Sequence, residues 1–371
     1  MNRQGSFAAW LAFLGLALLN LESPFAAEVS PKWEGEWEET VKAAEQEGQV
    51  VAYKLGPDAE WHAFQKRFPK IKVVLVHGSG GQTLQRIMAE RRAGKFLADV
   101  IRIGGGTSTS LYQAKALDPI ASAFILPEVK EPSRWFEGRH HYNDSENQYI
   151  FVYAAFPLRL LGYNTKLVQP KSITSFWDLL EPQWKGKITA KDPRDPGGGS
   201  PMLFFYYNPR LGPDYIRKLV TSGGLTFVRD ERQQTDWLAS GRYPLAITAK
   251  AEEVDEAKRQ GLPVEVFDPH AVKKDGVGLE SGGTMISLAN RAPHPNAAKV
   301  LMNWFLSREG QVAVQKGAPN ELGPNSLRED IPKDDIPPWA QRQKGAPYIR
   351  LWGSEVWDRA KVRKLVSELV P

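Results

Sequence analysis

The chain has 371 residues, a formal net charge of +5 and no cysteine. The lack of cysteine excludes a disulfide framework and a lipid-modified cysteine behind a signal sequence. The small basic excess is typical of a solvated surface and favours an anionic partner only weakly. Because the length exceeds that of one compact core, we expect two lobes.

Residues 1–27 have the layout of a secretory signal peptide. Arg3 lies in a short basic region, and residues 7–19 form an apolar run that is too short to span a bilayer. Ala26 and Ala27 suit cleavage, although Phe25 in the upstream position leaves the cleavage point open. The alternative is an uncleaved membrane anchor. Since the remaining sequence has no apolar stretch of membrane length, we expect an exported, soluble protein of the periplasm.

Strands and helices alternate through the next part of the chain. In order, the pattern predicts a helix at 37–47, a strand at 50–53, a helix around Trp61, a strand at 71–76, a helix at 83–94 and a strand at 99–103. Such β-α-β alternation favours a mostly parallel sheet with helices on both faces. This part of the chain is therefore predicted to form the first lobe.

The apolar run 149–161 is predicted to be one strand that crosses into a second lobe. Ser172 or Thr174 is expected to cap a short helix at 176–180, which Pro182 ends. The later predicted segments are strands at 187–190 and 243–248, helices at 214–219 and 233–241, a return crossing at 276–288, a helix at 297–311, a proline-rich linker at 331–338 and a helix at 361–369.

One stretch carries a family resemblance. The text from Tyr163 to Pro193, YNTKLV followed by SFWDLLEPQWKGKI and then DP, resembles the second lobe of bacterial extracellular solute-binding proteins. Residues 98–100, 116–120 and 297–311 are similar to the same family. These are the type II periplasmic receptors of ABC importers, and they include the ferric-ion binders.

The resemblance implies a two-lobed α/β fold in which each lobe is a mostly parallel sheet flanked by helices. The ligand cleft then lies between the lobes. The implied divisions after the signal peptide are lobe one at 28–153, lobe two at 154–277, a return segment of lobe one at 278–325, and a linker with a helical C-terminal tail at 326–371.

Four glycine-rich loops end predicted strands or open predicted helices, at 78–82, 104–108, 196–200 and 281–284. Glycine lets the backbone approach a ligand, and free N–H groups at a helix N-terminus favour an oxyanion. In open α/β sheets the carboxyl ends of the strands form the natural crevice. The ligand-binding residues predicted in these loops are Ser79, Gly80, Gln82, Gly105, Thr107, Ser108, Gly198, Gly199 and Ser200. None of the loops has the spacing of a nucleotide-binding motif.

Five further side chains are candidates for ligand binding. Lys250 follows a predicted lobe-two strand and can recognise charge, as can Arg159 and Arg102. Glu280 lies beside a glycine loop at the return crossing and can orient a ligand. Trp61 is either a core residue or a stacking platform under the cleft.

The ferric binders place consecutive tyrosines after the strand that corresponds to 245–247, and a carboxylate after the one at 99–103. This sequence has Thr248, Ala249 and Lys250 at the first place and glycines at the second. A ferric ion needs anionic oxygen ligands, so we expect no metal and no cofactor. Ferric binding by a non-standard ligand set is one alternative. Tyr206-Tyr207 is interpreted as packing, and His140-His141 as a polar surface loop.

The function that these features favour is a monomeric receptor that captures a small solute, with an anion favoured, and delivers it to an ABC permease. No nucleic-acid partner is expected. A secreted cleft hydrolase using Glu280 with Asp195 or Asp192 is the rival hypothesis. Because no nucleophile is paired with a base in the sequence, we expect no enzyme activity. A receptor that presents its ligand to a signalling partner remains a third alternative.

Overall fold

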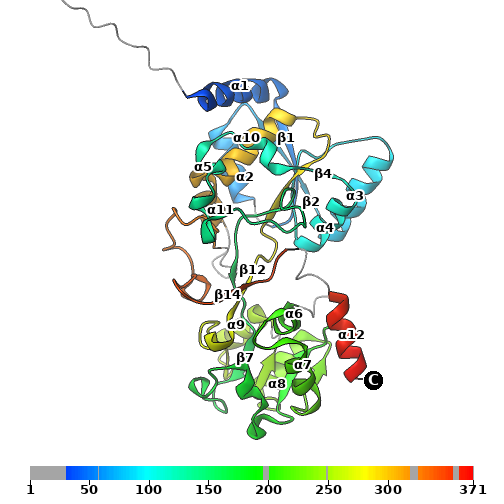
Figure 1. The fold of residues 1–371 in the computed structure, drawn as a ribbon, viewed down its shortest axis with the longest axis vertical. Helices are drawn as coiled ribbons and strands as arrows, with labels where there is room; N and C mark the ends of the chain where they lie inside the picture. Colours follow the sequence, from blue (N-terminus) through cyan, green and yellow to red (C-terminus); the bar gives the residue numbers. More distant parts are fainter. Residues whose placement is uncertain are drawn as a thin grey trace, which may run out of the picture.

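The computed structural model describes residues 31–56, 58–194, 200–247, 250–317, 325–353 and 359–370. Two lobes lie one above the other along the long axis of the molecule, and a small sheet lies between them (Figure 1). The predicted signal peptide lies outside the described residues, as do Asp195, Gly198 and Gly199. In the described ranges no helix is both long enough and apolar enough to cross a membrane.

Lobe one is built on a sheet of order β2-β1-β3-β13-β4, with β5 also paired to β13. Its strands are β1 (Gln49–Lys54), β2 (Lys72–His77), β3 (Val100–Arg102), β4 (Leu117–Asp118), β5 (Phe151–Val152) and β13 (Met285–Ala289). Its helices are α1 (Lys32–Glu47), α2 (Ala59–Arg67), α3 (Gly80–Arg92), α4 (Gly105–Gln113), α5 (Pro127–Lys130), α10 (Pro295–Leu306) and α11 (Arg308–Gly317). Strands β1, β2 and β3 are parallel, whereas β13 returns antiparallel to β3.

Lobe two has a second sheet of order β11-β7-β10-β8-β9. Its strands are β7 (Leu161–Asn164), β8 (Ile188–Lys191), β9 (Thr226–Val228), β10 (Leu245–Ile247) and β11 (Val264–Val266). Its helices are α6 (Ser200–Tyr207), α7 (Gly212–Thr221), α8 (Glu231–Ala239) and α9 (Ala251–Arg259). Because β8 is parallel to both β9 and β10, the carboxyl ends of these three strands share one edge.

A three-stranded sheet joins the lobes. It consists of β6 (Phe156–Pro157), β12 (Val277–Glu280) and β14 (Tyr348–Arg350), and β12 pairs antiparallel with β6 and parallel with β14. The prediction of one strand at 149–161 is wrong, because this run is divided among β5, β6 and the start of β7. The return crossing at 276–288 is likewise divided into β12 and β13 by a turn at 281–284, in which Gly282 adopts φ 58°.

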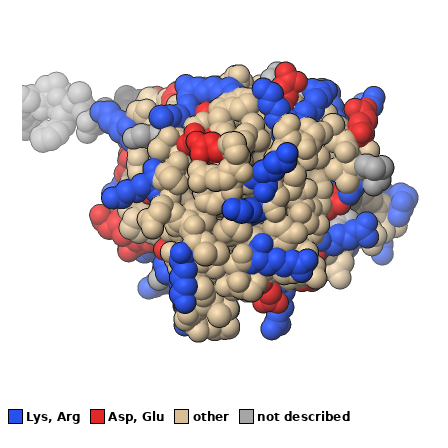
Figure 2. Space-filling model, turned by 90° about the horizontal axis from the view of Figure 1, so that it is seen from below, with Lys and Arg blue, Asp and Glu red and all other residues tan. Residues whose placement is uncertain are grey.

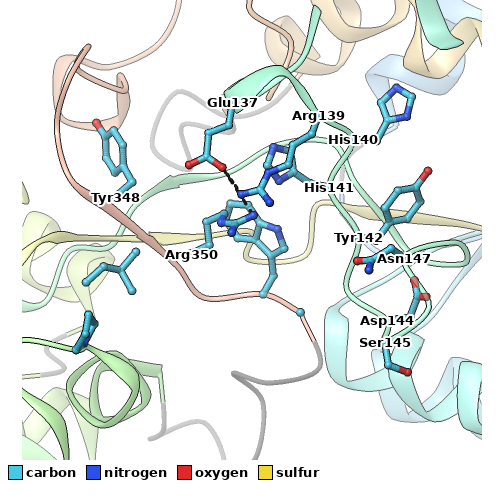
Figure 3. Close-up of a pocket in the computed structure, with 14 residues that line it drawn as sticks. Glu137, Arg139, His140, His141, Tyr142, Asp144, Ser145, Asn147, Tyr348 and Arg350 are labelled. Carbon is cyan, nitrogen blue, oxygen red and sulfur yellow. Dashed lines mark hydrogen bonds and ion pairs between the residues drawn. The ribbon is translucent and has the colours of Figure 1, made fainter. Parts of the chain in front are cut away.

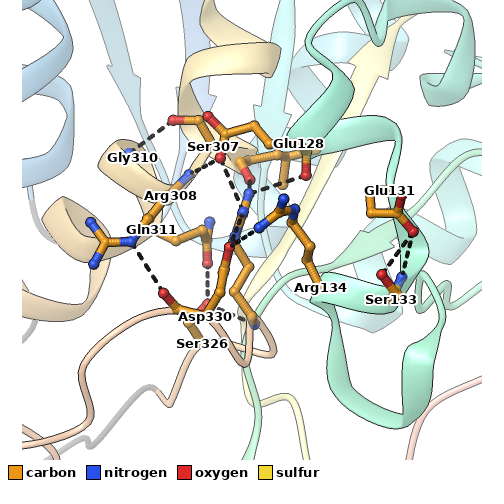
Figure 4. Close-up of polar contacts among 12 residues, drawn as sticks. Glu128, Glu131, Ser133, Arg134, Ser307, Arg308, Gly310, Gln311, Ser326 and Asp330 are labelled. Carbon is orange, nitrogen blue, oxygen red and sulfur yellow. Dashed lines mark hydrogen bonds and ion pairs between the residues drawn. The ribbon is translucent and has the colours of Figure 1, made fainter.

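The C-terminal tail contacts both lobes. In lobe one the fully buried Arg328 pairs with Asp330 at 2.7 Å and Glu128 at 3.0 Å, and it donates to the carbonyl of Leu306 at 2.9 Å. Asp330 also accepts from Arg134 (Figure 4). After β14 the chain reaches α12 (Arg359–Leu369), which packs on α6 and α7 of lobe two.

Two local predictions need correction. The short helix at Phe176–Leu180 is a 3-10 helix capped by Ser175, not by Ser172 or Thr174. The Ser175 hydroxyl accepts from the Trp177 N–H at 3.1 Å, and the Asp178 carboxylate accepts from the Ser175 N–H at 3.0 Å. This reciprocal pair satisfies two N–H groups that a helix start leaves unbonded.

The helix predicted at 297–311 is also two helices, because α10 ends at Leu306 and α11 begins at Arg308. Ser307 between them is extended, and its hydroxyl accepts from the Gly310 N–H at 3.1 Å. A Cβ at Gly310 would lie 1.9 Å from the Trp304 carbonyl oxygen. The close approach of the two helices therefore requires glycine at 310.

Candidate functional site

The carboxyl ends of the parallel strands of lobe one bring two predicted loops together. Helix α3 begins just after β2, and α4 begins just after β3. A Cβ built on Gly80 would lie only 2.5 Å from the Thr107 hydroxyl oxygen, so the two helix starts touch. Gly105 is packed as closely, since its Cβ would lie 3.0 Å from the Met285 methyl group. Glycine at both positions allows this contact.

The predicted donors in these loops differ in what they already bind. Ser79 and Gln82 form a capping box, in which the Gln82 N–H donates to the Ser79 hydroxyl at 3.3 Å and the Ser79 N–H to the Gln82 side-chain oxygen at 2.9 Å. Ser108 is buried and its hydroxyl lies 3.4 Å from the Ile103 carbonyl oxygen. These side chains hold the loops in shape.

The backbone N–H groups at the first two positions of each helix are the donors that the helix itself leaves for a ligand. They belong to Gly80 and Gly81 in α3 and to Gly105 and Gly106 in α4. An α-helix supplies no acceptor for its first N–H groups, and Gly104 caps α4 without a side-chain hydrogen bond. Two adjacent helix N-termini therefore present positive partial charge at this edge.

A buried ion network lies under this edge of lobe one. Arg102 is 9% exposed, donates to the Tyr153 hydroxyl at 2.7 Å and to the Leu55 carbonyl, and lies 3.3 Å from the Glu60 carboxylate. Burial raises the pKa of Glu60, although the Arg102 charge opposes this rise. The network fixes the loop after β1, so Arg102 is a supporting residue and does not offer its charge to a ligand.

Lobe two offers charged side chains at its edge. Lys250 precedes α9 and is 46% exposed, and its ammonium lies 3.6 Å from Glu231 and 3.5 Å from Glu253. Although burial opposes the effect, these carboxylates raise the pKa of Lys250. The lysine is therefore charged and already shared between two acids. Ser200 opens α6, and its side chain lies outside the described residues.

The other charged candidates of lobe two are also engaged. The buried Asp192 carboxylate receives Arg194 at 2.7 Å, which leaves it in a fixed pair. Arg159 makes a two-pronged contact with Asp255 at 2.6 and 3.0 Å, and its guanidinium lies 4.7 Å from the Trp339 ring centre. Neither residue is available to a ligand without breaking these contacts.

Glu280 lies at the end of β12, where the chain passes between the lobes. Burial and the charge of Glu252 in the first turn of α9 raise the pKa of Glu280 to about 7. Met285, which packs on Gly105, starts β13 only a short turn later. The segment from Glu280 to Met285 therefore has the edge of lobe two near its first residue and the edge of lobe one near its last. Within the described residues, the buried Ser281 hydroxyl in this turn has no hydrogen-bond partner.

The structure assigns three aromatic candidates to packing. Trp61 is 1% exposed with its ring 5.9 Å from that of Phe305, so it lies in the core and presents no face to the crevice. The rings of Tyr206 and Tyr207 pack at 5.0 Å on α6, beside the lobe-two core.

The interpretation of His140-His141 as a polar surface loop is wrong. His141 is 2% exposed and stacks on Phe136, and His140 packs among the rings of Trp135 and Phe151. Across the described ranges, no group of three or more His, Cys, Asp or Glu side chains is arranged to hold a metal ion.

Across the part of the chain that the structure describes, the face seen from the lobe-two end carries no single basic patch. Lysine and arginine side chains are distributed over this face and separated by uncharged surface (Figure 2). Single solvated charges of this kind add little attraction for a polyanion.

Comparison with known proteins identifies the family. A model of the bacterial extracellular solute-binding protein family matches residues 43–312, which include both lobe sheets and the hinge strands β6 and β12. The chain belongs to this family. A Haemophilus influenzae protein, described as uncharacterized, is 26% identical to this member over 348 residues, which are 88% of the chain and 92% of that relative.

Solved structures share the architecture. FutA from Trichodesmium, in complex with iron and citrate ligands, superposes with a TM-score of 0.64 at 18% identity, covering 87% of this chain and 99% of that one. An ABC transporter structure from Clostridium perfringens gives a TM-score of 0.61 at 14% identity, with coverages of 86% and 97%. Such low identity shows the fold alone, and the predicted two-lobed type II fold is confirmed. The resemblance to the solute-binding family is confirmed as well.

Proposed function

We propose that the protein is the substrate-binding component of an ABC importer, and that it captures a small anionic solute between its lobes. We also propose that the protein is exported to the periplasm and functions as a monomer. The observation that carries the ligand class is the contact between the N-termini of α3 and α4, where the N–H groups of Gly80, Gly81, Gly105 and Gly106 lie together.

The two edges contribute unequally to an anion site. A charged acceptor gains about 1.5–3 kcal/mol from each hydrogen bond to a well-placed donor, and helix N-termini add favourable partial charge. The ammonium of Lys250 adds less, because Glu231 and Glu253 already neutralise it. Lobe one therefore supplies the main anchor, and lobe two completes the enclosure.

Lobe closure would proceed by a hinge motion about β6, β12 and β14. Ligand contacts made from both edges stabilise the closed state, and the permease then reads that state. Glu280 and Glu252 lie where the edges meet, so closure changes the distance between carboxylates of the hinge and of lobe two. Their mutual repulsion is lowest when Glu280 keeps its proton.

We also propose binding without turnover. Asp192 is bound to Arg194 and is not free to act as a base. Glu280 has a pKa suited to proton transfer, but the neighbouring Ser281 hydroxyl has no hydrogen-bond partner within the described residues that would activate it. These two environments support binding over hydrolysis, while Asp195 lies outside the described residues.

A ligand screen tests the proposal. Melting temperatures are measured with carboxylates, phosphonates, phosphate esters, polyamines and ferric ion, because a ligand that binds only the folded state raises the melting temperature. Calorimetry on each hit gives the stoichiometry, and chromatography of the recovered ligand reports any conversion. We expect one anion bound per chain and returned unchanged. A tightest ligand that is cationic or neutral, or a converted ligand, contradicts the proposal.

A further inference from the structure

A cavity of about 520 Å³ lies where the tail passes lobe one, with lobe two at its rim (Figure 3). Its volume falls in the range of small-molecule sites. Lobe one contributes the loop 137–147, lobe two contributes Pro209, and the tail contributes Tyr348, Ile349, Arg350, Trp352 and Gly353. Among the described residues, no glycine-loop residue lines it, nor does Lys250 or Glu280. Its lining therefore differs from that of the site proposed above, although Asn143, which accepts from the Gly353 N–H at 2.9 Å, lies close to Gly105.

Two arginines from different elements reach one carboxylate in this cavity. Arg139 of the lobe-one loop hydrogen-bonds Glu137, and Arg350 of β14 lies 3.7 Å from the same carboxylate oxygen (Figure 3). Both guanidinium groups keep solvent access, with side-chain exposures of 48% and 35%. Burial and the charge of Arg139 lower the pKa of Arg350. One carboxylate cannot neutralise two guanidinium groups, so the cluster has an uncompensated positive charge.

A second acid of the cavity lining is held by its own loop. Asp144 lines the cavity, but its carboxylate accepts the N–H groups of Gln148, Tyr149 and Ile150 at 3.0, 3.0 and 2.9 Å. These bonds hold Asp144 to its own loop. An incoming anion would therefore meet the arginines, with Asp144 held back by its backbone partners.

His141 also lines this cavity, and one of its ring nitrogens is buried without a partner. Its Nε2 donates to the Phe136 carbonyl at 2.8 Å, which leaves Nδ1 with a free lone pair, and that atom is buried without a partner. Burial lowers the pKa of His141 to about 4, so the ring is neutral near pH 7. The Trp352 ring of the tail lies 5.6 Å away and holds the imidazole in place. The ring thus packs the tail against the lobe-one loop beside the two arginines.

We propose that this cavity is a second ligand site for a small acid with a carboxylate or phosphate group. The carboxylate or phosphate group of the acid contacts the solvent-accessible sides of the Arg139 and Arg350 guanidinium groups. Guanidinium groups suit this role because their planar forks match both acid groups. The bound acid joins the tail strand to the lobe-one loop, so occupancy ties the tail to lobe one beside the hinge.

Calorimetry with gluconate, inorganic phosphate and neutral glucose tests the site. Arg350→Gln and Arg139→Gln each remove a charge-assisted contact, so affinity for the bound acid should fall tenfold or more. Arg217→Gln is the matched control, since Arg217 forms a similarly exposed pair with Asp214 outside the cavity. Arg139 lies in a loop and not in a strand, so its variant remains informative if Arg350→Gln does not fold.

Gly106→Pro separates this site from the crevice, because it removes an N–H from the start of α4 and leaves the cavity unchanged. We expect the acid-binding event that Arg139→Gln and Arg350→Gln weaken to persist in Arg217→Gln and Gly106→Pro, and glucose to give no such event. The proposal is overturned if neither acid binds, or if both cavity variants keep wild-type affinity. It is equally overturned if Gly106→Pro abolishes the same binding event, since the acid would then lie in the crevice.

Discussion

The two edges of the crevice present different chemical groups to a ligand. Lobe one presents backbone N–H groups, and the buried contacts of Arg102 with Glu60 and Tyr153 lie at the end of the neighbouring strand β3. Lobe two presents solvent-exposed side chains, in which Lys250 is shared between two acids. Backbone donors beside a buried network cannot rearrange cheaply, whereas exposed ion pairs exchange partners at little cost. Lobe one is therefore the preorganised half and lobe two the adaptable half.

The largest expected effect comes from breaking the support of lobe one. Arg102→Met removes the larger of the two cationic influences on the buried Glu60 carboxylate, which costs about 3–5 kcal/mol of unfolding free energy. Urea denaturation of this variant and of Lys250→Met gives the comparison. The lysine variant should lose no more than about 1 kcal/mol. Equal losses in the two variants would show that the edges do not differ in this way.

A smaller effect concerns the hinge between the edges. In the unfolded chain Glu280 ionises near the ordinary glutamate pKa of 4.5, but in the folded protein it keeps its proton up to about pH 7. The folded state therefore binds more protons between these values, and stability through this group falls as pH rises from 4.5 to 7. We expect Glu280→Gln to reduce that fall by about 1–3 kcal/mol.

Denaturation at a series of pH values measures the effect of Glu280→Gln. The exposed Glu256, which pairs with Arg259, supplies the control variant Glu256→Gln. If wild type and Glu280→Gln show the same pH dependence, Glu280 ionises normally and the account of the hinge is wrong.

A modest effect is expected at the adaptable edge itself. Lys250→Ala removes a cation that Glu231 and Glu253 already neutralise, so affinity for the anion identified by the screen should fall by about fivefold or less. Calorimetry with that anion measures the change. A fall of a hundredfold would mean that lobe two, and not lobe one, holds the acid group.

No measurable change is expected with ferric ion. The family resemblance aligns the segment that carries Lys250 with the tyrosine ligands of the ferric binders, and an ammonium beside such a site would repel a trivalent cation. Titration of the protein with chelated ferric ion is followed by visible absorption. A tyrosinate charge-transfer band that appears with tight stoichiometric binding would contradict this expectation.

The alternating strands and helices of both lobes were predictable because their apolar residues repeat at strand and helix periods. Strand β14 was not, since Tyr348–Arg350 is short and becomes a strand only by pairing with β12. The burial of His141 could not be predicted either, because His141 packs against Trp352, which is far from it in the sequence. Contacts between residues far apart in the sequence leave no local pattern.

The candidate site also has a part that the sequence predicts and a part that it does not. The close approach of Gly80 to Thr107 follows from two glycine loops after adjacent parallel strands, which the sequence reveals. The roles of Arg102 and Trp61 depend on burial against distant partners, and burial of a single arginine or tryptophan cannot be read from local spacing. Residue type and position predicted the edge, but not which side chains face it.

The most direct measurement compares Gly106→Pro with Gly106→Ala in calorimetry against the anion found by the screen. Proline removes one N–H and is tolerated in the first turn of a helix, whereas alanine keeps the N–H and its Cβ meets no atom within 4 Å. We predict that the proline variant binds the anion at least tenfold more weakly and that the alanine variant binds like wild type. Equal affinity in all three proteins would contradict an anion held by the N-termini of α3 and α4.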